Sequence, residues 1–151
     1  LSGFHPLGRR LGCGSSRVVF ASGRDRVLKI AKNPAGLAQN RAEWEISQFN
    51  LNLPIAKAID HADDFSWVLA ERAVQRKEFS RDEYCEMERK LQGICSDICQ
   101  QNVGRIRGRW VALDYGYTAE VSDKHYSGKG FDSLKNFATE PELVAKYNGD
   151  E

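Results

Sequence analysis

Short runs of β-prone residues alternate with polar turns in the first half of the chain. Residues 18–21 and 26–30 flank a Ser-Gly-Arg-Asp turn, and this pattern predicts a β-hairpin. Residues 54–59 and 66–70 form a second pair of runs, joined by the polar turn 61–64. Two pairs of strands are therefore expected.

Between and after these strands the apolar spacing changes to three and four residues. This spacing predicts a helix over about 37–49, after a proline-containing break at 33–36. A second helix is predicted to begin after Ser80, because Ser80 and Glu83 have the spacing of a capping box. The apolar stripe of this helix extends as far as Ile98.

The period returns to two after residue 102. Residues 103–106 and 109–113 flank Arg107-Gly108 and predict a second tight hairpin. The polar segment 117–151 predicts one short helix after Pro141. This order of elements predicts an α+β fold with room for two lobes.

Composition narrows the class of protein. A chain of 151 residues suits one domain, and 41% apolar with 28% charged residues fits a folded globular protein. No apolar run approaches the roughly 20 residues of a membrane-spanning helix, so no membrane partner is expected. Four cysteines suit a reducing, cytoplasmic setting.

The formal net charge of +1 hides an uneven distribution. Residues 1–41 carry a net charge of +7 and the remainder −6. A basic first part suits an anionic ligand such as a nucleotide phosphate or a nucleic acid, and the alternative is an ordinary solvated cationic face.

The first candidate site is a glycine-rich turn. Gly12 and Gly14, followed by Ser15 and Ser16, precede a β-run, where glycines let the backbone approach a phosphate closely. Lys29 lies on the following strand between apolar neighbours, and its ammonium would neutralise phosphates. The alternative is an edge-strand lysine that reaches solvent.

The helix over 37–49 offers a carboxylate partner for such a lysine. Glu43 and Glu45 lie two residues apart, hence on different faces, so only one can point inward. Glu43 is favoured because Ile46 lies on its side of the helix.

Three further polar residues come later. Asp114 follows an apolar strand, and it precedes Tyr115-Gly116. With the amide of Asn102 it offers the oxygen ligands that Mg²⁺ prefers. Asp97 would accept a proton from an attacking hydroxyl, unless the preceding helix simply continues through it to about Gln101.

In this order the motifs resemble the protein kinase-like fold, and look most like small phage-encoded serine/threonine kinases. The resemblance runs from about residue 11 to residue 116. It implies a compact two-lobe fold with a truncated C-terminal lobe. The lobes would be 1–73, a β-sheet with one helix, and 74–151, a reduced lobe with a tail.

The resemblance also implies a role for each site residue. The glycine-rich turn and Lys29 would hold the phosphates of ATP, with Glu43 paired to Lys29. Asp97 would be the catalytic base. Asn102 and Asp114 would bind Mg²⁺, and the backbone from Glu71 to Ala73 would recognise adenine.

The implied function is an ATP- and Mg²⁺-dependent serine/threonine protein kinase that acts on a host protein in the host cytoplasm. Arg17 stands where the family usually has a third loop glycine, and Cys95-Ser96 precede the expected base. These departures, with the short C-terminal part, favour an alternative: a catalytically weak or inactive kinase-like module that binds and inhibits a host protein. Arg17 would then reach into the nucleotide site as a substitute cation. Nucleic-acid binding is a third interpretation, based on the basic first part.

Overall fold

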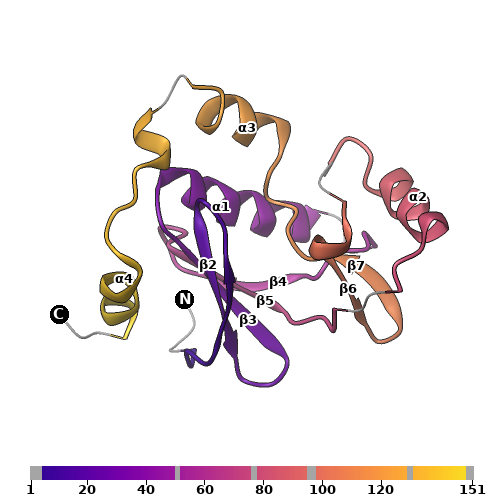
Figure 1. Cartoon of the computed structure of the whole chain (residues 1–151), viewed down its shortest axis with the longest axis horizontal. Helices are drawn as coiled ribbons and strands as arrows, with labels where there is room; N and C mark the ends of the chain where they lie inside the picture. Colours follow the sequence, from indigo (N-terminus) through magenta and orange to yellow (C-terminus); the bar gives the residue numbers. More distant parts are fainter. Residues whose placement is uncertain (1–4, 50–51, 76–77, 95–97, 129–130, 149–151) are drawn as a thin grey trace.

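The computed structural model describes residues 5–49, 52–75, 78–94, 98–128 and 131–148. Its centre is an antiparallel five-stranded sheet with the strand order β1-β2-β3-β5-β4 (Figure 1). The strands are β1 (Arg10–Cys13), β2 (Arg17–Ser22), β3 (Arg26–Ala31), β4 (Ala58–His61) and β5 (Trp67–Glu71). The hairpin predicted from residues 18–30 is confirmed as β2 and β3.

Helix α1 (Pro34–Phe49) packs along one face of this sheet (Figure 1). It begins three residues before the predicted start. The Asn33 side chain accepts a hydrogen bond from the Gly36 amide at 3.0 Å, and proline is favourable in the first turn of a helix. The expected break at 33–36 is therefore the helix start itself.

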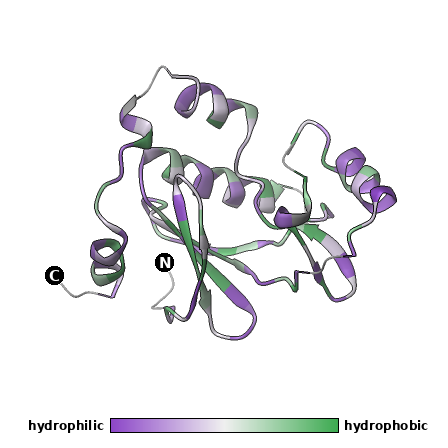
Figure 2. Ribbon diagram, viewed as in Figure 1, coloured by the Kyte–Doolittle hydropathy of each residue, from purple (hydrophilic) through white to green (hydrophobic). Residues whose placement is uncertain are grey.

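The other face of the sheet carries a closed apolar cluster. Its buried members are Val18, Phe20, Leu28, Ile30 and Leu69. Leu7 and two residues of helix α4 (Glu140–Tyr147) pack against it, so this part of the tail belongs to the folded body. Figure 2 shows these central strands mainly in green, the colour of hydrophobic residues. Because side chains alternate across a strand, Arg17 and Lys29 lie on the opposite face, toward α1.

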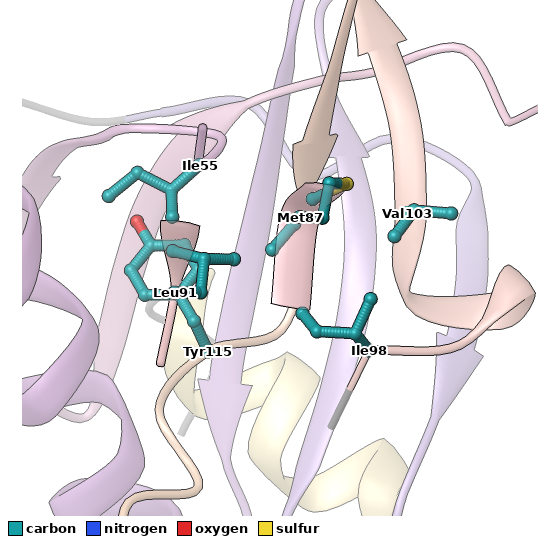
Figure 3. Close-up of a cluster of buried hydrophobic side chains, with 7 residues drawn as sticks. Ile55, Met87, Leu91, Ile98, Val103 and Tyr115 are labelled. Carbon is teal, nitrogen blue, oxygen red and sulfur yellow. The ribbon is translucent and has the colours of Figure 1, made fainter. Parts of the chain in front are cut away.

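A second apolar cluster joins the C-terminal part to the segment between α1 and β4 (Figure 3). It contains Ile55, Met87, Leu91, Ile98, Val103, Ala112 and Tyr115. Residues 54–59 were expected as one strand, but β4 begins only at Ala58. The Ala56 amide instead donates to the Ala112 carbonyl at 2.9 Å, so this segment pairs with the second hairpin.

The second hairpin is confirmed as β6 (Val103–Ile106) and β7 (Arg109–Ala112). Positive φ angles of 51° at Arg107 and 79° at Gly108 turn the chain as a tight two-residue loop requires. A short 3-10 helix over Gln100–Asn102 precedes the hairpin.

Helix α2 (Arg81–Lys90) has the predicted capping box at Ser80 and Glu83. It ends at Lys90, and Gly93 has a φ of 80°. The helix therefore does not continue through to Gln101. Asp97 itself, with Cys95 and Ser96, lies outside the described residues.

The tail holds more structure than its polarity suggested. Helix α3 (Ala119–His125), capped by Thr118, contacts α1, and a 3-10 helix covers Phe131–Leu134. The α+β class is thus confirmed, with a mostly antiparallel sheet. Within the described part of the chain, no helix has the length and hydropathy to cross a membrane.

Candidate functional site

A cleft of about 1020 Å³ opens between the first strands, the end of β5 and the segment that follows β7. Nine of the residues singled out in the sequence line it: Gly12, Gly14, Ser15, Ser16, Lys29, Glu71, Ala73, Asn102 and Asp114. Residues separated by up to about a hundred positions in the chain therefore meet around one space.

Lys29 lies at the centre of this arrangement. Strand β3 is paired on both sides, by β2 and β5, so Lys29 is not on an edge strand. Its Nζ lies 2.8 Å from Glu43 Oε1 and donates to the Leu113 carbonyl oxygen at 2.5 Å. The predicted ion pair with Glu43 is confirmed. Glu45, the rejected alternative, pairs with Arg41 on the exposed side of α1.

Arg17 is the second buried cation of the site. Its side chain is only 6% exposed. The guanidinium donates to Glu43 Oε2 at 2.7 Å, to Asp114 Oδ1 at 2.5 Å and to Asn40 Oδ1 at 3.1 Å. Arg17 therefore joins β2, α1 and the segment after β7 through one planar group.

Two cations determine the ionisation of Glu43, whose side chain is 1% exposed. Burial alone would raise the pKa of this carboxyl group, but the charges of Arg17 and Lys29 outweigh it and lower the pKa to about 2. Burial alone would lower the pKa of Arg17, but the negative charges of Glu43 and Asp114 raise it above its ordinary value. Glu43 is thus a carboxylate, and Arg17 a guanidinium, at any physiological pH.

The glycine-rich turn is anchored by hydrogen bonds that its backbone carbonyl oxygens accept. Lys32 Nζ donates to the Gly14 carbonyl at 2.8 Å, and Asn33 Nδ2 to the Ser15 carbonyl at 3.0 Å. The Ser16 carbonyl accepts from the Lys32 amide at 2.7 Å. A turn anchored in this way is fixed in place at the mouth of the cleft.

Tyr126 connects the turn to the tail. Its hydroxyl lies 2.5 Å from Ser16 Oγ and accepts a hydrogen bond from Gln39 Nε2 at 2.5 Å. Tyr117 packs against its ring, with centroids 5.0 Å apart. The residues after β7 thereby close one end of the cleft.

The segment from Glu71 to Val74 also lines the cleft. The Arg72 amide donates to the Asp25 carbonyl at 2.9 Å, and Val74 exchanges two backbone hydrogen bonds with Arg105. A Cβ on Gly104 would lie 2.8 Å from that of Ala73, so only glycine permits this close approach. The backbone around Ala73 is therefore held rigidly beside the cleft.

Asn102 and Asp114 lie together, because the Leu113 amide donates to the Asn102 carbonyl at 2.8 Å. Both line the cleft, as a metal site would require. However, Asp114 Oδ1 accepts a hydrogen bond from the Arg17 guanidinium. A divalent cation at that oxygen would meet a fixed positive charge, so the residues do not fit Mg²⁺ in this arrangement. Among the described residues, no three His, Cys, Asp or Glu side chains cluster as metal ligands.

Three polar residues of the site escaped sequence reasoning. Asn40 lies three positions before Glu43 and hence on the same helix face, a spacing that would have indicated it. Gln39, four positions before Glu43, shares the same face and could have been indicated in the same way. Tyr126 carried no such signal, because its contact with Gln39 joins the tail to α1 over 87 positions.

In comparisons with known proteins, no family model matches this chain and no curated protein matches its sequence.

Proposed function

We propose that this protein is a minimal, kinase-like ATP-binding protein that transfers the γ-phosphoryl group of ATP to serine or threonine of a host protein. The observation that supports this proposal is the convergence of Lys29 and the carboxylate of Asp114 on one cleft, with Glu43 paired to Lys29 behind it. The glycine-rich turn and the 71–73 segment line the same space.

In this proposal the sheet with α1 is the N-terminal lobe, and the region after residue 73 is a reduced C-terminal lobe. The ammonium of Lys29 and the turn at Gly12 and Gly14 would hold the phosphates. Lys29 is suited to this role because Glu43 and the Leu113 carbonyl fix its position. The rigid backbone near Ala73 would recognise adenine.

Transfer needs a base and positioning of the reacting groups. Asp97, which lies outside the described residues, is the proposed base. The resemblance implies magnesium at Asn102 and Asp114, but these residues do not fit the metal while Arg17 occupies the Asp114 carboxylate, so no step is assigned to it. Because Arg17 holds the Asp114 carboxylate, the proposal assigns the neutralisation of the phosphate charge to the cations of the chain itself.

Calorimetric titration with ATP tests the binding step. Lys29→Met removes a buried ammonium from the cleft, and we expect the affinity for ATP to fall at least about tenfold. Lys124→Met is the matched control, since Lys124 pairs with Glu120 on an exposed helix face, outside the lining of the cleft. Failure of the unmodified protein to bind ATP in any buffer refutes the proposal.

Transfer is measured separately, with γ-labelled ATP and a lysate of the proposed host. We expect labelled protein bands that disappear with Asp97→Asn and weaken with Lys29→Met. Both variants are first shown to be folded by circular dichroism.

One observation favours a second function. An Asp114 carboxylate that is already paired with Arg17 suits a kinase-like module that grips a host protein with little or no turnover. ATP binding without any labelled product would select this alternative, whereas labelling that depends on Asp97 would exclude it.

A further inference from the structure

Arg17 lies in the cleft against Asp114, the residue that the resemblance would make a metal ligand. It lines the cleft while 6% exposed, and it lies against both the Asp114 and the Glu43 carboxylates. Three of the five N–H donors of its guanidinium are used by described residues.

The charges of the site are balanced without any added ion. Lys29 and Arg17 carry two positive charges, and Glu43 and Asp114 two negative ones. The full lining of the cleft holds three carboxylates and five cations: Arg9, Arg17, Arg24, Lys29 and Arg72. With Glu43, which pairs with two of these cations from behind the lining, five cations face four carboxylates, a small excess of positive charge that favours a polyphosphate.

We propose that the cleft binds the phosphates of ATP without a divalent cation, with the Arg17 guanidinium at Asp114 supplying the positive charge that a metal ion would otherwise supply. This inference rests on the proposed binding of ATP, which both candidate functions share. Guanidinium is weakly hydrated and forms paired hydrogen bonds with phosphate, so it serves this purpose well.

The deciding measurement is the dissociation constant of ATP for the unmodified full chain, by calorimetry, in EDTA and in excess Mg²⁺. We expect the two constants to agree within about threefold. Binding that is tenfold or more weaker in EDTA overturns the inference while ATP binding itself stands. No binding in either buffer overturns both the inference and the proposed function.

Asp114→Asn separates the two roles of this carboxylate. Removing its charge releases Arg17 for phosphate, so we expect ATP to bind more tightly in EDTA, by about twofold to tenfold. Asp114 is 43% exposed, so the variant should fold. If the carboxylate instead holds a metal, the variant weakens ATP binding in Mg²⁺, and the inference is wrong.

Arg17→Met removes the proposed counter-cation. We expect it to weaken ATP binding at least about tenfold more in EDTA than in Mg²⁺. Arg24→Met is the matched control, because Arg24 lines the same cleft from the exposed β2–β3 turn. It should change the affinity by the same factor in both buffers. Equal ratios of the two dissociation constants in the two variants would contradict the specific role of Arg17.

Should Arg17→Met fail to fold, the measurements on Asp114→Asn and on the unmodified chain still decide whether ATP binds without a divalent cation.

Discussion

Glu43→Gln is the most informative single change, because this carboxylate balances two buried cations. Its two oxygens accept from Arg17 at 2.7 Å and from Lys29 at 2.8 Å. Glutamine has nearly the same shape, but an NH₂ group replaces one of the two oxygens. This NH₂ group donates hydrogen bonds, so it would meet Arg17 or Lys29 as donor against donor. The variant therefore leaves buried positive charge without compensation.

The pKa of Glu43 sets the size of the effect. A fall from the ordinary value of 4.5 to about 2 corresponds to on the order of 3 kcal/mol of stability at neutral pH. Removal of one partner from a buried ion pair typically costs about 3–5 kcal/mol, which agrees with this figure. For a chain of this size, such a loss lowers the melting temperature by roughly 10 °C.

The pH dependence gives the same prediction a second readout. Because the pKa of Glu43 is lower in the folded state, its stabilisation is fully present above about pH 4.5 and is lost as the pH falls toward 2. Urea unfolding of the unmodified protein and of Glu43→Gln should therefore differ most at neutral pH and converge in acid.

Glu45→Gln provides the control on the same helix. Glu45 and Arg41 are 61% and 66% exposed, and such surface pairs contribute at most about 1 kcal/mol. If Glu43→Gln destabilises the protein no more than Glu45→Gln, or if its loss of stability does not shrink in acid, the argument from buried charge is refuted.

Two further substitutions test the packing around the site by urea unfolding. Tyr115→Phe removes a buried hydroxyl that donates to the Ala56 carbonyl at 2.6 Å, and it should cost about 1–2 kcal/mol; an unchanged unfolding midpoint would contradict this. Gly116→Ala places a Cβ 2.9 Å from Glu43 Cγ and against the α1 backbone, and it should cost about 2 kcal/mol or more. Gly14→Ala, with open space around its Cβ, is the comparison, and equal losses would show that the close approach at Gly116 is not limiting.

Local sequence determined most of the elements. Alternating residues with Gly-containing turns specified the hairpins around Gly23 and Gly108, since turn geometry and side-chain alternation act over a few residues. The capping box at Ser80 and Glu83 likewise marked the start of α2. The same local reasoning misjudged 33–36, where a proline that ends one pattern also begins a helix.

The sequence alone also selected Glu43 over Glu45, because helix periodicity fixes which face a residue takes. It did not determine which side chains that face of the helix contacts. The buried contact of Arg17 with Asp114, 97 positions apart, depends on how β2, α1 and the segment after β7 pack together. Tertiary packing alone decides such a contact, because a charge leaves water only where the whole fold brings its partners to it.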